Sequence, residues 1–144
     1  MQPSPDKPSL LVKPTVDTKY HIDYSWWETS GEDLRTYVLS HLLPEQRDQL
    51  SQTTEERVID YVDPDTGEVF QMDELGLAIQ LAAKDPDYVG PQTALVDAIF
   101  RVFLANSNTP LSIRDLAERT NRPANTILKM LSGHIWKGIR PYQP

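Results

Sequence analysis

The spacing of hydrophobic positions switches between strict alternation and helical periodicity, and this mixture predicts an α+β protein. The stretch KYHIDYSWW alternates aromatic or aliphatic residues with polar ones over residues 20–26, which is typical of a half-buried strand. Residues 57–72 alternate on both sides of DPDTGE, a turn in which Pro64 suits the second position and Gly67 tolerates positive φ. We therefore expect a small N-terminal antiparallel sheet accompanied by helices, with a β-hairpin at 57–72.

Helices are predicted where apolar residues recur every three or four positions and a capping residue precedes them. In the N-terminal half, Ser30 is expected to cap one helix, with Asp33 near the capping-box position. Pro44 suits the first position of a second helix, and Asp73 is expected to cap a third. Together these residues predict a helical layer beside the expected sheet.

The C-terminal half is helical almost to its end. Thr93 is expected to cap an apolar helix, ALVDAIFRVFLAN, and Ser112 to cap the next with Asp115 at the capping-box position. A further helix, ANTILKMLS, is expected to end at Gly133, a typical helix C′ residue. The residues HIWKGIRPY then suggest a strand or a tight hairpin at Lys137 and Gly138.

Composition divides these elements into three parts. Four prolines within residues 1–17 predict a flexible tail, and the proline- and glycine-containing PDYVGP separates an α+β part, residues 18–88, from a helical unit, residues 91–144. Residues 1–90 hold 7 basic and 18 acidic residues, a net charge of −11, whereas residues 91–144 hold 7 basic and 3 acidic residues, a net charge of +4. Such a split hints at a nucleic-acid-facing part, although two ordinary solvated surfaces give the same numbers.

Residues 93–140 contain the combination that two helices crossing at a steep angle require. Ala117 is small enough for the crossing, Asn121 tolerates the left-handed conformation of a sharp turn, and Ile127 is a branched apolar anchor. Leu116, Met130 and Leu131 complete the expected buried face. This stretch resembles the helix-turn-helix superfamily, including its winged-helix branch, and the resemblance implies a three-helix unit.

The resemblance also implies contacts with duplex DNA, because the second helix of the motif enters the major groove in that superfamily. The expected contacts to bases and to the backbone around them are Asn125, Thr126 and Lys129, with Arg122 in the turn. Arg114, Arg119, Lys137 and Arg140 are expected to reach phosphates. Pro123 and Ala124 depart from this pattern, since they occupy positions where base-reading side chains often lie.

A protein–protein adaptor, or a surface for self-association, is the alternative. Leu128 is expected on the exposed side of the same helix, where a leucine suits a protein partner better than DNA. Trp27 is a second candidate for partner binding: on a strand, it and Trp26 would face opposite sides, although a following helix could cover it. Trp136 is expected to pack on the core of the helical unit.

Enzyme chemistry has little support in this sequence. The chain has no cysteine, which excludes thiolate catalysis and cysteine-based zinc sites, and no nucleotide-binding glycine loop or catalytic triad is present. His21, Asp23, Glu28 and His41 suggest a metal site, but nothing fixes all four near one point, so we expect no metal and no cofactor.

Neither a signal sequence nor a long apolar segment is evident, which predicts a cytoplasmic protein that does not enter a membrane. The N-terminal half, with its tryptophan pair and VDPDTGEV hairpin, resembles only bacterial proteins of unknown function.

Overall fold

The computed structural model describes residues 13–51, 58–62 and 65–144, and it confirms the α+β class. These residues form two compact units. The larger unit contains the described residues up to Glu32 together with Val89–Pro144, and the smaller unit is Asp33–Tyr88. The expected tail, residues 1–17, lies mostly outside the described residues.

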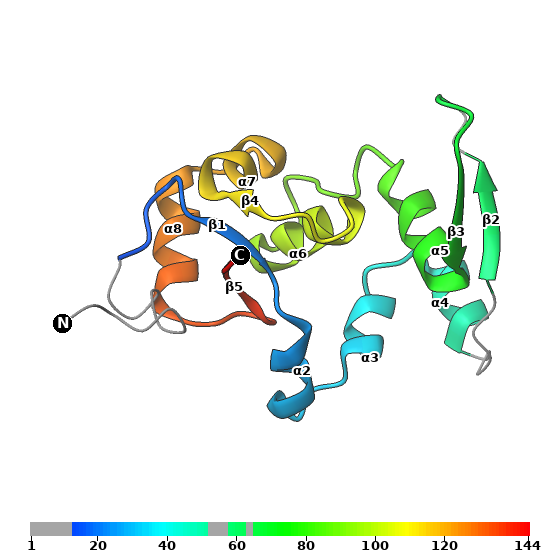
Figure 1. The fold of residues 1–144 in the computed structure, drawn as a ribbon, viewed down its shortest axis with the longest axis horizontal. Coiled ribbons are helices and arrows are strands. Elements are labelled where there is room, and N and C mark those ends of the chain that lie inside the picture. Colours follow the sequence, from blue (N-terminus) through cyan, green and yellow to red (C-terminus); the bar gives the residue numbers. More distant parts are fainter. Residues whose placement is uncertain (1–12, 52–57, 63–64) are drawn as a thin grey trace. The chain divides into compact units, whose positions relative to one another are not determined.

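The larger unit is built on a three-stranded antiparallel sheet with the order β4-β1-β5. The central strand is β1 (Lys19–Ile22), which pairs on one side with β4 (Leu111–Ser112) and on the other with β5 (Ile139–Pro141). An N-terminal strand is therefore inserted between two strands of the C-terminal half, as Figure 1 shows. The boundary expected at residues 88–91 coincides with the end of the smaller unit, but residues 18–32 belong to the larger unit and not to the part expected at 18–88. The reason is that strand pairing, unlike composition, joins segments distant in sequence.

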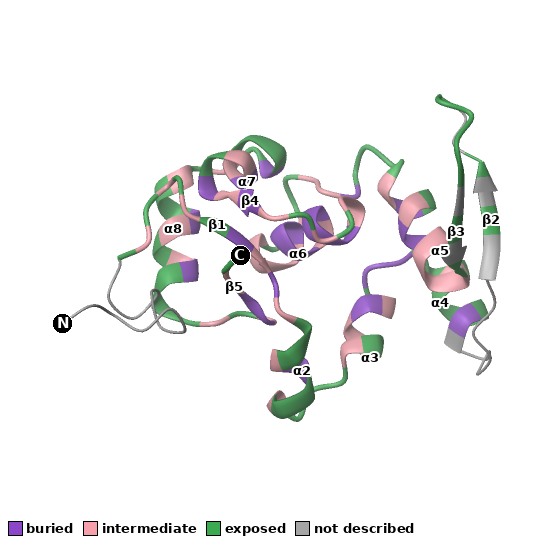
Figure 2. Ribbon diagram, in the orientation of Figure 1, coloured by how far each residue is buried: buried purple, intermediate pink, exposed green. Residues whose placement is uncertain are grey.

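Three helices complete the core of this unit: α6 (Leu95–Ala105), α7 (Ile113–Thr120) and α8 (Ala124–Gly133). Most of α6 is buried, which agrees with its apolar sequence (Figure 2). The largest fully buried side chains come from both ends of the chain: Tyr20, Ile22, Ile99, Phe100, Phe103, Ile113, Leu116, Ile127 and Ile139. Their burial, at about 25 cal/mol per Å² of apolar surface, is the main force that joins the N-terminal strand to the helices.

The predicted strand over residues 20–26 ends earlier than its alternation suggests. Tyr20 and Ile22 are buried, as expected, but Asp23 then caps α2 (Tyr24–Ser30), where its carboxylate accepts a hydrogen bond from the amide of Ser25 at 3.0 Å. This cap satisfies a helix N-terminus and outweighs the strand propensity of the aromatic residues that follow. Trp26 and Trp27 consequently lie on a helix and not on opposite faces of a strand.

The smaller unit combines three helices with the predicted hairpin. Its helices are α3 (Leu34–Leu39), α4 (Pro44–Ser51) and α5 (Glu74–Ala83), and its strands β2 (Val58–Val62) and β3 (Val69–Asp73) pair in antiparallel register. Gly67 has a φ of 75°, as its place in the turn requires, whereas Pro64 lies outside the described residues. The hairpin expected at 57–72 is thus confirmed over its described strands.

Of the three helix starts expected in this half, two are confirmed and one is wrong. Pro44 begins α4, and the carboxylate of Asp73 accepts a hydrogen bond from the amide of Gly76 at 2.6 Å at the start of α5. Ser30 is the last residue of α2 and does not open a helix; Asp33 caps α3 instead. The reason is Gly31, whose φ of 81° ends one helix before the next begins.

Candidate nucleic-acid interface

The pair α7–α8 forms a rigid frame held by a capped helix and a tight turn. Ser112 accepts a hydrogen bond from the amide of Asp115 at 3.1 Å, and the Asp115 carboxylate accepts one from the amide of Ser112 at 3.1 Å, which confirms the predicted capping box. Asn121 ends α7 in the left-handed conformation, with φ 55° and ψ 41°. Ile127 is fully buried on α8, so the turn and the anchor predicted from sequence both occur.

Two other expected helix ends in this half differ from the prediction. The helix α6 begins one residue later than expected, so Ala94 occupies the N-cap position, and its side chain has no polar atom to cap with. The hydroxyl of Thr93 accepts a hydrogen bond from the amide of Gly90 at 3.2 Å. Gly133 is still part of α8 and does not adopt positive φ; the helix ends as His134 becomes extended. Neither change affects the turn between α7 and α8.

One polar face of α8 is exposed. Asn125, Thr126 and Lys129 are three or four positions apart, or adjacent, so they share a side of the helix, and each is exposed. Arg119, in the last turn of α7, is exposed as well. Among the residues that the structure describes, none forms an ion pair or a hydrogen bond with these four side chains. They are the expected contacts that stay accessible.

Arg122, predicted to touch DNA, instead holds the segment that precedes α6. Its Nη2 donates hydrogen bonds to the carbonyl oxygens of Thr93, Pro91 and Gly90 at 2.6, 3.2 and 3.3 Å. The Gly90 carbonyl also accepts a hydrogen bond from the amide of Thr93 at 3.1 Å, so the guanidinium chiefly serves the carbonyls of Pro91 and Thr93, which precede the helix. The structure thus gives Arg122 a role in the fold.

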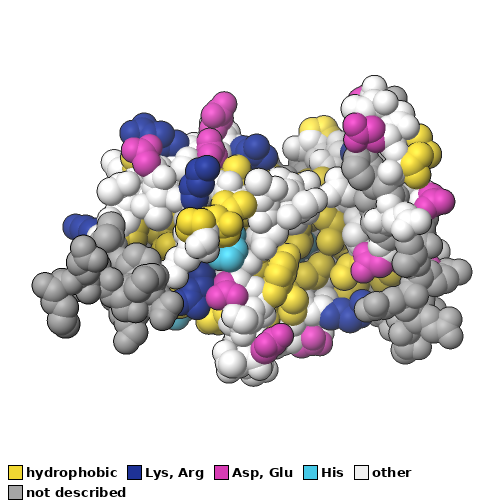
Figure 3. All heavy atoms as spheres, viewed as in Figure 1, with side chains coloured by type: hydrophobic (Ala, Val, Ile, Leu, Met, Phe, Trp, Pro, Cys, Tyr) yellow, Lys and Arg dark blue, Asp and Glu magenta, His cyan; other side chains and the backbone are white. Residues whose placement is uncertain are grey.

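The other three basic residues expected to reach phosphates each form an ion pair with a carboxylate. Arg114 pairs with Asp17 at 2.8 Å, Lys137 pairs with Glu32 at 2.6 Å, and Arg140 pairs with Asp23 at 3.3 Å. On the face drawn in Figure 3, basic and acidic side chains are interspersed in the region of α7. The signal for these pairs was absent from the local sequence, because the partners are about a hundred residues apart.

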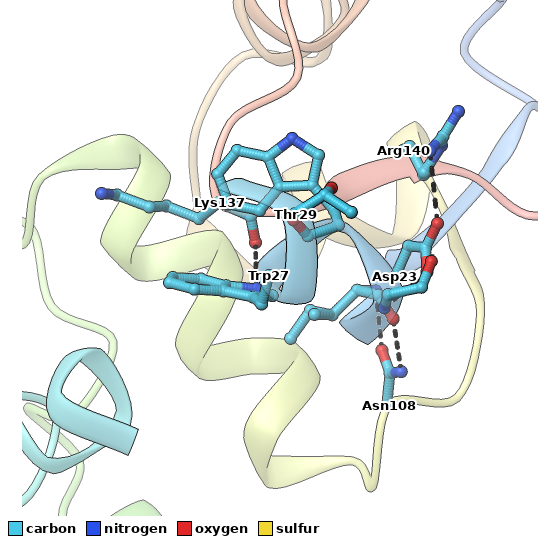
Figure 4. A network of polar contacts seen from close by, with 9 residues as sticks. Asp23, Trp27, Thr29, Asn108, Lys137 and Arg140 are labelled. Atoms are coloured by element: carbon cyan, nitrogen blue, oxygen red, sulfur yellow. Dashed lines mark hydrogen bonds and ion pairs between the residues drawn. The ribbon is translucent and has the colours of Figure 1, made fainter. Parts of the chain in front are cut away.

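Trp27, predicted as a partner-binding residue, is buried and is not available to a partner. Its Nε1 donates a hydrogen bond to the carbonyl oxygen of Lys137 at 3.0 Å (Figure 4). Its ring also lies edge-to-face with that of Phe100, at a centroid distance of 6.1 Å. Leu128, the other candidate, is only half-buried on α8. Trp136, expected to pack on the core, is 38% exposed, and its Nε1 donates to the carbonyl oxygen of Met130.

The C-terminal turn is a two-residue hairpin, as predicted, and it does not form a long wing. Lys137 and Gly138 have φ of 52° and 80°, and the amide of Ile139 bonds the carbonyl oxygen of Trp136 at 2.9 Å. A Cβ at Gly138 would lie 2.9 Å from the carbonyl oxygen of Asp23 and 3.0 Å from the Trp27 indole nitrogen. Both the conformation and the close approach therefore require glycine.

Asn108 is a structural residue that the sequence did not reveal. It adopts a left-handed conformation after α6, and its side chain bonds both backbone groups of Ile22: Oδ1 accepts from the amide at 2.8 Å, and Nδ2 donates to the carbonyl at 2.8 Å. Figure 4 shows this pairing beside the Asp23–Arg140 ion pair. The partner of this asparagine is 86 positions away, so the local sequence carries no signal for the pairing.

The ionisable groups on and next to β1 shift one another's pKa values. Burial lowers the pKa of His21 more than the nearby Asp23 carboxylate raises it, and Arg140 lowers it further. Burial alone would raise the pKa of Asp23, but hydrogen bonds from Ser25 and the positive charges of Arg140 and His21 place it below its usual value. The ring of His21 also lies edge-to-face with Tyr142, at a centroid distance of 5.1 Å.

His21 and Asp23 do not form part of a metal site in this structure. Within the described residues, no group of three or more histidine and acidic side chains converges as a metal would require. Asp23 is engaged by Ser25 and Arg140, and Glu28 lies exposed on α2.

In the part of the chain that the structure describes, no helix is long and apolar enough to cross a bilayer.

Comparisons with protein-family models, curated proteins and solved structures give no significant match for this chain.

Proposed function

We propose that this chain is a cytoplasmic DNA-binding regulatory or accessory protein of the helix-turn-helix superfamily. The observation that supports the proposal best is the exposed polar face of α8, where Asn125, Thr126 and Lys129 are without partners among the described residues. These side chains project from a helix whose opposite side is anchored by Ile127 and Leu131. A recognition helix, which contacts base edges in the major groove, needs this combination of a fixed backbone and accessible polar side chains.

The side chains on this face have the chemistry that base edges require. Asparagine can bind adenine through two hydrogen bonds, and lysine can bind either guanine or a phosphate oxygen. Arg119 adds a positive charge at the end of α7, suited to a phosphate. In this proposal the smaller unit, Asp33–Tyr88, modulates binding or dimerises.

The test compares Lys129→Ala with Arg122→Ala in titrations of duplex DNA. We expect Lys129→Ala to weaken binding, to reduce the slope of log affinity against log salt by about 1, and to leave the thermal melt unchanged. Arg122→Ala should lower the melting temperature, because the carbonyl groups of Pro91 and Thr93 lose their side-chain donor, while the folded protein keeps the wild-type salt slope. Equal DNA binding by Lys129→Ala and wild type would contradict the proposal.

A protein–protein adaptor is the second candidate, and one feature of the smaller unit favours it. Val62 and Val69 are cross-strand partners at the turn end of the β2–β3 hairpin, and they are 55% and 62% exposed. Adjacent exposed valines on a strand pair are suited to an apolar contact. If the wild-type chain fails to bind duplex DNA and Val62→Lys abolishes self-association or partner binding, the adaptor becomes the better description.

A further inference from the structure

Three of the basic residues expected to reach DNA are paired with carboxylates from one short segment. Asp17, Asp23 and Glu32 lie within 16 positions of each other, yet their partners are Arg114 on α7, Arg140 on β5, and Lys137 in the C-terminal turn. We propose that residues 17–32 act as an internal competitor of DNA phosphate. The carboxylates form ion pairs with basic side chains that would otherwise contact the phosphates of the duplex. This inference rests on the proposed DNA binding.

The backbone around β1 holds the segment in place for this role. The amide of Arg114 donates to the carbonyl oxygen of Val16 at 3.1 Å, and the amide of Tyr142 donates to that of Lys19 at 2.8 Å. These backbone hydrogen bonds place Asp17 beside the start of α7. A tethered carboxylate competes with phosphate at a high effective concentration, in contrast to a free anion from solution.

The three pairs differ in how easily a phosphate can replace the carboxylate. Arg114 and Asp17 have side chains 66% and 73% exposed, so their attraction is screened and weak, and the pair between Lys137 and Glu32 is also partly exposed. Asp23 is held more firmly, because it also caps α2 and accepts a hydrogen bond from the Ser25 hydroxyl at 2.6 Å. Asp17 and Glu32 are thus the exchangeable members of the set.

The test uses the full chain and three variants that change net charge equally: Asp17→Asn, Glu32→Gln and the control Glu28→Gln. Glu28 belongs to the same segment and is exposed, and among the described residues it has no basic partner. All four proteins are titrated against one random-sequence duplex at several salt concentrations, after a thermal melt. Because the side chain of Asp17 is largely exposed and that of Glu32 is partly exposed, we expect melts close to that of the wild type.

Each basic side chain that loses its carboxylate partner should contact one more phosphate of the duplex. We expect Asp17→Asn and Glu32→Gln each to steepen the salt dependence by about 0.9 and to raise affinity up to about tenfold near 50 mM salt, the counterion-release limit for one contact. Glu28→Gln should produce only the smaller, uniform gain caused by its change in net charge. Adding Asp17→Asn to Arg114→Ala should then gain no more than Glu28→Gln does, because no cation is left to release.

The outcomes separate this inference from the proposed function. If the wild type binds DNA and both Asp17→Asn and Glu32→Gln match Glu28→Gln, the inference is overturned and the proposed function stands. If no protein in the set binds DNA at any salt concentration, both are overturned. Binding by Asp17→Asn or Glu32→Gln, but not by the wild type or Glu28→Gln, would support the inference in its strongest form.

Discussion

Single residues in this protein form contacts that close the sheet of the larger unit. The side chain of Asn108 acts as a strand neighbour for Ile22, since it supplies one acceptor and one donor to a backbone that otherwise lacks them. Gly138 permits a turn that passes within contact distance of Trp27. The turn at Gly138 was predicted, but the groups that both residues contact lie far away in sequence, so neither pattern nor propensity indicated these contacts.

Replacing Asn108 should test how much this pairing contributes. We expect Asn108→Ala to lower the free energy of unfolding by about 1–3 kcal/mol, because two backbone groups lose their partner and alanine tolerates the left-handed conformation poorly. Asn108→Gly is the matched control, since it keeps the conformation and loses only the hydrogen bonds. Denaturant unfolding measures both. An Asn108→Ala protein as stable as the wild type would show that water replaces the side chain without cost.

His21 should make the stability of the larger unit depend on pH in the mildly acidic range. Its pKa is lowered in the fold, chiefly by burial, so the unfolded chain binds the proton more readily. Stability is therefore full above the ordinary value of 6.5 and falls as the pH decreases below it. The lowered pKa of Asp23 acts separately, near and below its ordinary value of 3.8.

The experiment compares melting temperatures across this range for the wild type, His21→Gln and His134→Gln. We expect His21→Gln to flatten the dependence below pH 6.5, while His134→Gln, which replaces an exposed histidine, keeps it. Identical profiles for the wild type and His21→Gln would assign the dependence to another group.

At the scale of elements, β1 decides how the chain is divided. It pairs with β4 and β5, whose own residues come from the C-terminal half, and it supplies Tyr20 and Ile22 to their shared core. Hairpin strands such as β2 and β3 are neighbours in sequence and could be predicted. The strand β1 could be predicted too, but its partners, about ninety or more residues away, could not, because they are chosen by apolar burial and not by local spacing.

Residues 91–144 alone should consequently fail to fold as a stable unit. Without β1, the strands β4 and β5 have no common neighbour, and the core loses two large side chains, each worth about 1.5–3 kcal/mol when fully buried. The control is a chain in which residues 13–32 are joined to 89–144 by a flexible linker, and this chain should unfold cooperatively. Circular dichroism melts compare the two. A cooperative melt of the shorter fragment near the wild-type temperature would contradict the assigned role of β1.

At the scale of the molecule, the folded units redistribute charge relative to the two halves of the sequence. Residues 1–32 with 89–144 hold 10 basic and 8 acidic residues, a net charge of +2, and residues 33–88 hold 4 basic and 13 acidic residues, a net charge of −9. The larger unit is thus less positive than the +4 of its C-terminal part suggests. Three acidic residues of this unit form ion pairs with basic residues of the candidate interface: Asp17 with Arg114, Asp23 with Arg140, and Glu32 with Lys137.

The sequence by itself determined the local features: the α+β class, the β2–β3 hairpin, the capping box of α7, the left-handed Asn121 and the buried Ile127. Each depends on residues a few positions apart, where spacing and backbone preference are sufficient. Tertiary structure alone decided which cations of the predicted interface are paired and which stay exposed. In the sequence, Arg114, Arg122 and Lys137 are equally plausible DNA contacts. In the fold, each binds a carboxylate or carbonyl group from a distant segment, because folding places those groups within hydrogen-bond distance.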